Sequence, residues 1–285
     1  MVKKKLIYIM GAGRSGSTLL DVVLGNAQEI FSCGEIIKFP SLNGCPHGFD
    51  IGSETYALWK RVETRFLGKN SNHSLQKIAR LAESIENHKA FLLTMFRLHS
   101  SAKVEQYREY INDMVDAISE ETGRNILVDS SKYPGRALAL LECLNYDVYV
   151  IYLKRNPVDV VLSFRKRDVE QPPKSFFAAN VYLFVIGLLC FLAVRRFDRD
   201  RCLTMTYEEF LKDPAETLAR IEQKFQVDLS DPIYLARGGK PMRVGKLFEG
   251  NRIRLRESIV LVKGSTTVSK NMGYYVTRIV NYLWY

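Results

Sequence analysis

Short apolar runs recur along this chain and are separated by stretches with helical or turn character. The runs with the composition of buried β-strands lie at about Lys5–Met10, Asn125–Asp129, Asp147–Leu153 and Cys202–Thr206. The first is apolar almost throughout, as in a parallel sheet covered on both faces. Between and after the runs the pattern predicts helices at about 17–24, 135–144, 157–167, 175–197 and 214–225. This alternation predicts an α/β fold of the P-loop type, with a mostly parallel sheet flanked by helices.

The region from about 54 to 121 has a different pattern. It contains no convincing strand, and its periodicity predicts helices near 54–66, 74–87, 89–98 and 102–120. We interpret it as a helical insertion within a single domain that spans residues 1–285. Residues 26–53 mix Gly, Pro, Asn and Ser and are predicted to form a loop with short turns.

Polar clusters follow each predicted strand. Gly11–Thr18 comes after the first strand, Asp129–Lys132 after the second, Arg155 after the third and Tyr207 after the fourth. The carboxyl ends of parallel strands meet at one edge of the sheet, where open α/β sheets bind their ligands. The sequence therefore predicts one composite site at this edge.

The segment Gly11–Thr18 reads Gly-Ala-Gly-Arg-Ser-Gly-Ser-Thr and has the frame of the phosphate-binding loop G-x-x-x-x-G-K-[ST]. Ser17 stands where NTPases have the lysine that reaches the β- and γ-phosphates. Backbone N–H groups and the N-terminus of the following helix can still bind a phosphate. The cation of the loop has moved to Arg14. This pattern predicts a nucleotide whose transferred group is not a γ-phosphate.

The net charge and the cysteine content indicate which partners the protein binds and in which cellular compartment it is found. Lysine and arginine number 41 against 31 acidic residues, which gives a net charge of +10 and predicts anionic partners. The five cysteines are scattered and form no C-x-x-C pair, so we expect reduced thiols and a cytoplasmic location. Cys45 and His47 alone do not make a zinc site, and no metal is predicted.

An apolar stretch, Val181–Val194, raises the question of a membrane. It is shorter than the roughly 20 residues that span a bilayer, so we predict a buried helix of the core. Peripheral contact with a membrane, with Arg195 and Arg196 at the headgroups, remains the alternative.

Three blocks, in order, resemble the sulfotransferases that use 3′-phosphoadenosine-5′-phosphosulfate (PAPS), in particular their bacterial and tyrosylprotein branches. Gly11–Leu20 resembles the loop for the 5′-phosphosulfate. Leu153–Ser163 resembles the block for the 3′-phosphate, R-x-P-x-D-x-x-x-S. Thr206–Pro214 is similar to the family's Y-E-D-L-x-x-D-P stretch.

The resemblance implies roles for individual residues. It implies that Arg155 and Ser163 bind the 3′-phosphate and that Tyr207 contacts the adenine. Gly238–Arg243 is faintly similar to a G-N-P-x-R stretch of bacterial members, which would make Arg243 a further ligand of the nucleotide. The ligands of the 5′-phosphosulfate would be Gly13, Arg14, Ser15, Gly16, Ser17 and Thr18.

The resemblance also implies catalytic roles. Glu35, in the sequence Cys33-Gly-Glu35, is similar to a glutamate that acts as the base in these branches. Arg14 would relieve charge on the bridging oxygen, and Lys132 would stabilise developing charge. The catalytic histidine of the cytosolic branch has no counterpart, because Asp129–Lys132 occupies that region.

The predicted activity is in-line transfer of a sulfuryl group from PAPS to a hydroxyl or amine, without a metal. The expected partners are PAPS or its desulfated product PAP, and a small-molecule, glycan or lipid acceptor, with no nucleic acid. A P-loop kinase or NTPase is the first alternative, in which Asp129 would bind magnesium. The second is a basic protein that binds polyanions without catalysis.

Overall fold

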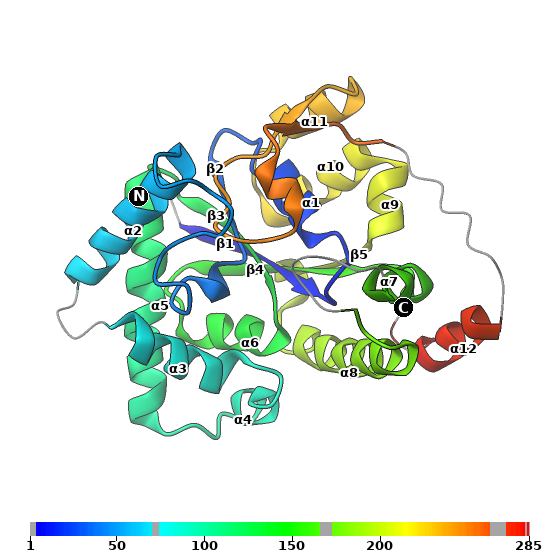
Figure 1. Cartoon of the computed structure of the whole chain (residues 1–285), viewed down its shortest axis with the longest axis horizontal. Helices are drawn as coiled ribbons and strands as arrows, with labels where there is room; N and C mark the ends of the chain where they lie inside the picture. The colour runs from blue at the N-terminus through cyan, green and yellow to red at the C-terminus, as the bar shows by residue number, and fades with distance from the viewer. Residues whose placement is uncertain (1–3, 70–73, 166–172, 263–271, 283, 285) are drawn as a thin grey trace.

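The computed structural model describes residues 4–69, 74–165, 173–262, 272–282 and 284. Its centre is a parallel five-stranded sheet with the strand order β2-β3-β1-β4-β5. The predicted α/β architecture is therefore confirmed (Figure 1). The strands are β1 (Lys5–Gly11), β2 (Ile30–Gly34), β3 (Ile126–Lys132), β4 (Asp147–Lys154) and β5 (Cys202–Thr206), and a separate antiparallel pair is formed by β6 (Met242–Arg243) and β7 (Ser258–Ile259).

Helices surround the sheet on both faces. Their bounds are α1 (Ser17–Leu24), α2 (Glu54–Lys69), α3 (Leu75–Glu86), α4 (Phe91–Met95), α5 (Ser101–Thr122), α6 (Pro134–Cys143), α7 (Pro157–Arg165), α8 (Phe176–Val194), α9 (Tyr207–Lys212), α10 (Pro214–Phe225), α11 (Ser230–Arg237) and α12 (Met272–Asn281). The expected end of the α7 helix, at 167, lies outside the described residues.

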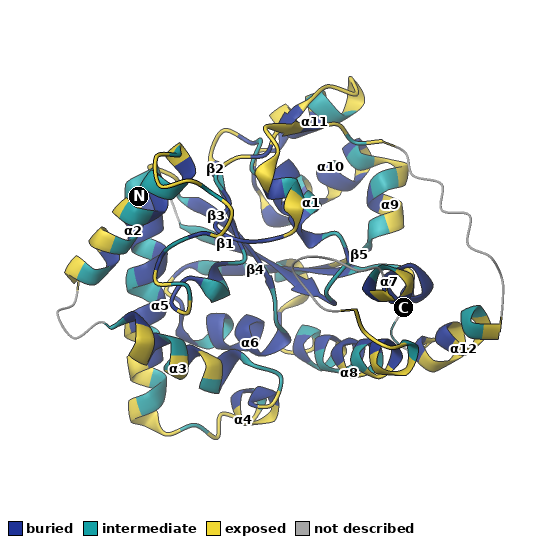
Figure 2. Ribbon diagram, viewed as in Figure 1, coloured by how far each residue is buried: buried dark blue, intermediate teal, exposed yellow. Residues whose placement is uncertain are grey.

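The alternation of side chains along β1 explains why this strand is apolar throughout. Leu6, Tyr8 and Met10 point into a core shared with the insertion helices, α6 and α8. Ile7 and Ile9 point into the opposite core, shared with α1 and α10. All five side chains are fully buried, because helices cover each face of the sheet (Figure 2).

The stretch predicted to be a helical insertion contains α2, α3, α4 and α5, and no strand lies among its described residues. These helices gather beside and below the sheet in Figure 1. Segments 87–90 and 96–100 connect α4 to its neighbours, and in the second of them Phe96 and Leu98 are exposed to solvent. The predicted helix positions are confirmed to within a few residues.

The prediction of a loop over residues 26–53 was wrong in one respect, because Ile30–Gly34 forms the edge strand β2. This strand is short, contains Ser32 and Gly34, and pairs only with β3. Its apolar signal is therefore too weak to stand out in the sequence. The strand matters because it ends directly before Glu35.

Candidate active site

The phosphate-binding loop connects β1 to α1, and its glycines allow close packing. A Cβ on Gly11 would lie 2.4 Å from the Leu153 carbonyl oxygen. Gly16 has φ of 93°, and a Cβ there would lie 2.3 Å from the ring of Tyr207. Ser17 begins α1, so the positive end of the helix dipole faces the loop. The loop thus has the backbone form of an anion site.

Two cavities open at the carboxyl edge of the sheet. The first, which we call the loop cavity, has a volume of about 550 Å³ and lies over α1. The second, the insertion cavity, has about 580 Å³ and lies between α3 and α8. Both are lined by Gly13, Glu35, Lys38 and Lys132. The predicted site residues that line the loop cavity are Gly13, Arg14, Gly16, Ser17, Thr18, Glu35, Lys132, Arg155, Ser163 and Tyr207.

Two predicted ligands do not line the loop cavity. Ser15 is buried within the loop and does not line either cavity, and in the part of the chain that the structure describes its hydroxyl has no hydrogen-bond partner. Arg243 lies on β6, where its backbone N–H donates to Asn26 Oδ1 at 3.0 Å. Asn26 follows the C-terminus of α1, so Arg243 is at the opposite end of that helix from Ser17.

Arg155 is held rigidly over the loop. Its Nη1 donates to the carbonyl oxygen of Arg14 at 2.9 Å, and its guanidinium lies 4.6 Å from the ring centroid of Tyr207. Its Nε is buried and has no hydrogen-bond partner among the described residues. A buried N–H group of a cation that makes no hydrogen bond lowers the stability of the protein unless an anion accepts a hydrogen bond from it. The geometry fits an anionic group on the substrate at this point.

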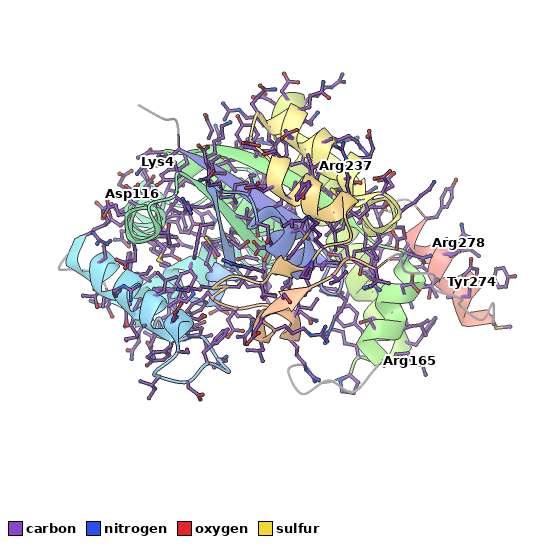
Figure 3. All side chains as sticks on the ribbon, turned by 90° about the horizontal axis from the view of Figure 1, so that it is seen from above. Lys4, Asp116, Arg165, Arg237, Tyr274 and Arg278 are labelled. Atoms are coloured by element: carbon purple, nitrogen blue, oxygen red, sulfur yellow. The ribbon has the colours of Figure 1, made fainter. Side chains whose placement is uncertain are left out.

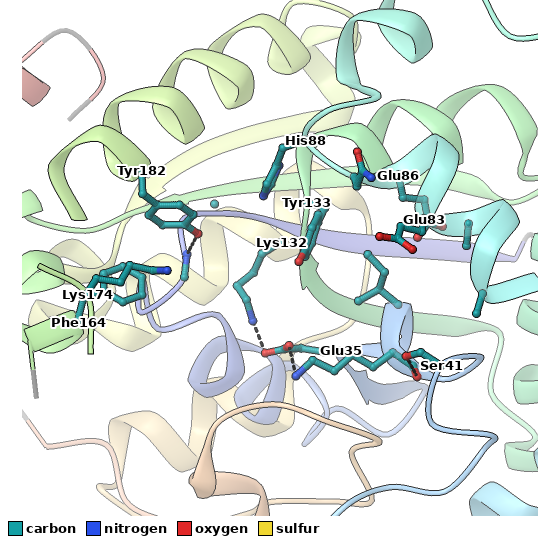
Figure 4. Close-up of a pocket in the computed structure, with 17 residues that line it drawn as sticks. Glu35, Ser41, Glu83, Glu86, His88, Lys132, Tyr133, Phe164, Lys174 and Tyr182 are labelled. Carbon is teal, nitrogen blue, oxygen red and sulfur yellow. Dashed lines mark hydrogen bonds and ion pairs between the residues drawn. The ribbon is translucent and has the colours of Figure 1, made fainter. Parts of the chain in front are cut away.

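Glu35 lies at the boundary between the two cavities (Figure 4). Its carboxylate contacts the ammonium group of Lys132, and Lys38 Nζ lies 3.1 Å from Oε2. Burial raises the pKa of Glu35, but the two lysines outweigh it and hold the pKa below its ordinary value. Glu35 is therefore ionised at neutral pH and can accept a proton from a group in the insertion cavity.

Buried contacts fix the position of Glu35. Its backbone N–H donates to the Glu249 carbonyl oxygen at 2.8 Å. Asp21, in α1, accepts from the N–H of Gly34 at 3.0 Å and from the hydroxyl of Ser130 at 2.6 Å. Burial raises the pKa of Asp21 to about 7. Asp21 thus joins the ends of β2 and β3, which carry Glu35 and Lys132 toward each other.

Arg14 and Lys132 both have left-handed backbone conformations, with φ of 67° and 75°. Such conformations cost non-glycine residues about 1–3 kcal/mol and concentrate at functional sites. The fold holds both cations in these conformations beside the loop cavity. We infer that their positions serve binding or chemistry.

Below the insertion cavity lies a network of buried charges. Arg136, in α6, donates through Nε to Asp129 Oδ2 at 2.8 Å and through Nη1 to Glu86. The hydroxyl of Tyr107 also donates to Glu86, at 2.6 Å. Asp129 is completely buried and further bound by Ser131. Its carboxylate is therefore engaged with the core and not directed at the loop, which argues against the magnesium-binding role of the NTPase alternative.

The far side of the insertion cavity is formed by aromatic and polar side chains. The rings of His88 and Tyr133 stack with centroids 4.6 Å apart, and Tyr182 faces them from α8 (Figure 4). Burial lowers the pKa of His88, so its ring is neutral at pH 7. Within the described ranges, His88 Nδ1 and Glu86 Oε2 are buried without hydrogen-bond partners. This end of the cavity offers hydrogen-bonding groups to a polar ligand.

The sequence reading missed the wall formed by residues 247–255. The N–H of Asn251 donates to Thr18 Oγ1 at 3.1 Å, and Gly250 packs against the same side chain. Arg254 is buried, donates to the His47 carbonyl oxygen at 2.6 Å and pairs with Glu249. In the sequence, the sign of this wall was the polar run Glu249-Gly-Asn-Arg252 inside a basic stretch. The sequence does not show that this run contacts α1, because the contact joins residues far apart in the chain.

A parallel α/β sheet with a phosphate loop and basic side chains at its carboxyl edge defines a nucleotide-binding fold of the P-loop kind. The model of the Sulfotransferase family matches residues 7–231. The chain therefore belongs to the sulfotransferase family and is a PAPS-dependent sulfotransferase. No curated protein sequence matches this chain.

Solved structures confirm the fold. The sulfotransferase domain of the Synechococcus PCC 7002 olefin synthase is 18% identical, with a TM-score of 0.56, over 99% of this chain and 95% of that one. The sulfotransferase domain of the curacin biosynthetic pathway is 16% identical, with a TM-score of 0.54, over 97% and 96%. Sulfotransferase STF1 of Mycobacterium tuberculosis is 15% identical, with a TM-score of 0.50, over 82% and 70%.

Proposed function

We propose that the loop cavity binds PAPS and that the insertion cavity binds an acceptor with a hydroxyl or amine group. The observation that carries the proposal is that Glu35 and Lys132 line both cavities. A group would pass from one ligand to the other at the boundary that the cavities share, and a base and a cation lie at this boundary.

The residues around the loop cavity fit a nucleotide with two separate anionic groups. The loop backbone and the N-terminus of α1 would hold the 5′-phosphosulfate. Arg155, whose Nε is unpaired, and Ser163 would hold the 3′-phosphate. Tyr207 would contact the adenine. We leave Arg243 out of this set because of its place at the other end of α1.

The proposed reaction is a direct displacement at sulfur. Glu35 takes the proton of the acceptor hydroxyl while the acceptor oxygen forms a bond to sulfur. The bond between sulfur and the bridging oxygen breaks, and PAP leaves with the electron pair. Arg14 and Lys132 stabilise the negative charge on that oxygen. Since these side chains supply the positive charge, the proposal includes no metal.

The same features weigh against the two alternatives. The kinase or NTPase reading needs a lysine at Ser17 and an accessible carboxylate at Asp129, and Asp129 is buried against Arg136. A protein that only binds polyanions has no need of a buried, ionised glutamate beside a second cavity. We further propose a cytoplasmic site of action, which the five cysteines without disulfide partners support, and no nucleic-acid partner.

The test separates binding from transfer. Calorimetry without magnesium should detect binding of PAP to the wild-type chain. Acceptor classes are then screened for transfer of radiolabelled sulfate from PAPS. In Glu35→Gln the affinity for PAP should stay within about threefold, while transfer should fall by about 10²–10⁴ through loss of the base.

Glu29→Gln is the matched control, because Glu29 is an exposed carboxylate just before β2. It should leave both measurements unchanged. Two results would contradict the proposal: full transfer by Glu35→Gln, or consumption of ATP with magnesium by a chain that does not bind PAP.

A further inference from the structure

Helix α8 is more exposed than a core helix would be. It has 19 residues and a mean hydropathy of 2.4, yet only 39% of its most apolar window is buried. The predicted helix, 175–197, is confirmed to within a few residues. The 19 residues of α8 form about 28 Å of helix, which would nearly cross a bilayer. However, α8 packs against β1, β4 and α6. Because one side covers the sheet, α8 is not free to span a membrane.

The other side of α8 carries a stripe of exposed apolar residues. Phe177, Val181 and Val185 are spaced by four positions and are 77%, 46% and 41% exposed. Residues at this spacing lie on one face of a helix. Single exposed apolar residues are ordinary, but a stripe along a helix marks an interaction surface.

Helix α12 contacts α8 and exposes further apolar residues. It packs on α8 through a hydrogen bond of 3.1 Å from Asn281 to Asn180 and through Trp284, whose ring lies 5.7 Å from that of Phe184. In Figure 2, α12 lies next to the right-hand end of α8, at the lower right of the molecule. The apolar face, as we call it, consists of Phe177, Val181, Val185, Met272, Tyr275, Val276, Ile279, Val280 and Tyr282.

The two helices that carry the apolar face contain no acidic residue, and basic residues lie on them or next to them. Neither residues 171–197 nor residues 258–285 contain an Asp or Glu. The described basic residues of these segments include Lys174 before α8, Arg195 after it and Arg278 in α12. Figure 3 shows Arg278 and Tyr274 pointing outward from α12. An apolar surface with tyrosines and a basic rim is the pattern of interfacial membrane binding.

We propose that the apolar face docks on the surface of a membrane that contains anionic lipids. Its apolar side chains enter the boundary between headgroups and acyl chains, while Lys174, Arg195 and Arg278 contact lipid phosphates. A second copy of this chain is the less favourable occupant, because a symmetric pair would bring the two basic rims together without acidic partners.

The docking surface is joined to the insertion cavity, and this part of the inference rests on the proposed function. Lys174, Phe164 and Tyr182 line that cavity and lie beside or on the N-terminal part of α8. Tyr182 also accepts a hydrogen bond of 2.9 Å from Gly13 N–H. A docked molecule would hold the cavity near the lipid headgroups, so the acceptor would be a hydroxylated headgroup or another membrane-bound molecule.

The test uses the full chain and sedimentation with vesicles. Vesicles of phosphatidylcholine with phosphatidylglycerol should bind the protein, and vesicles of phosphatidylcholine alone should bind it more weakly. The double variant Val181→Glu with Ile279→Glu should reduce binding at least about tenfold. Arg195→Ala with Arg278→Ala should reduce it on the order of 25-fold, from about 1 kcal/mol for each basic residue near an anionic surface.

Leu98→Glu is the matched control, since Leu98 is 66% exposed but lies in the insertion, and it should bind vesicles like the wild type. Each variant is also tested for PAP binding, which should be unchanged and reports folding separately from docking. The proposal is overturned if the wild type does not sediment with anionic vesicles, or if Leu98→Glu weakens binding as much as the double variant. It is also overturned if the wild type is a dimer that the double variant dissociates, because a second copy then covers the face.

Discussion

The loop cavity and the insertion cavity meet at Glu35 and Lys132 but are built in opposite ways. The loop cavity is lined by short segments at the ends of strands and by the 247–255 wall, and it offers backbone N–H groups and cations. The insertion cavity joins α3, the end of β3 and α8, and it offers Glu83, Glu86, His88 and aromatic rings. Under the proposed function, the donor would meet mainly short motifs at strand ends, whereas the acceptor would meet side chains that long-range packing brings together.

The largest expected effect breaks the attachment of the insertion to the sheet. Arg136→Met would leave Asp129 and Glu86 buried without their cation. Removal of one partner from a buried ion pair costs about 3–5 kcal/mol, so the free energy of unfolding should fall by that amount. Urea denaturation at pH 7 measures it.

The control for this variant is Arg97→Met, which removes an exposed ion pair with Glu142. It should leave the free energy of unfolding nearly unchanged. Equal losses in the two variants would show that the buried network does not hold the insertion cavity in place.

The next effect concerns the loop cavity alone. Arg155→Ala should raise the Kd for PAP by about 10–100-fold, because a hydrogen bond to a charged group contributes about 1.5–3 kcal/mol. Arg155→Lys should lose part of this affinity, since a lysine cannot reproduce the stacking on Tyr207. Calorimetry with PAP measures both.

Arg243→Ala is the internal comparison for Arg155→Ala. Its place on β6 predicts an unchanged Kd for PAP, against the role that the resemblance implied. If Arg243→Ala weakened PAP binding as strongly as Arg155→Ala, Arg243 would belong to the nucleotide ligands and our exclusion of it would be wrong.

The smallest expected effect is a shift in the pH dependence of the transfer rate, which reports the pKa of Glu35 between the two cavities. Lys38 and Lys132 hold the pKa of Glu35 low, so the rate should decline only when acid protonates this carboxylate. Lys38→Met should raise the pKa of Glu35 and move the acidic limb of kcat/KM to higher pH, with little change at pH 8. A profile identical to that of the wild type would remove Lys38 from this role.

The local part of the structure was readable from the sequence. The bounds of α1 and α10 follow from Gly16–Ser17 and from Asp213-Pro214, where Asp213 caps the helix and Pro occupies its first position. The phosphate loop and Arg155 were found because they follow predicted strands, whereas Glu35 was found through the resemblance of Cys33-Gly-Glu35 to a family stretch, since the strand before it was not predicted. These features depend on a few neighbouring residues.

The remaining features depend on residues far apart in the chain. β2 is recognisable only through its pairing with β3, and the 247–255 wall only through contacts such as that of Asn251 with Thr18. The exposure of α8 likewise depends on which side meets the sheet, although its composition is apolar all round. The pattern of apolar and polar residues along the chain does not reveal these long-range contacts.

The position of Glu35 between the cavities has a consequence for the order of events under the proposed mechanism. A single carboxylate faces both ligands, and the proposal gives no side chain the task of carrying sulfate between them. Both substrates must then be present together, and each catalytic cycle passes through a ternary complex. With the insertion cavity empty, water beside Glu35 could take the place of the acceptor, so an acceptor that fills this cavity would limit hydrolysis of the donor.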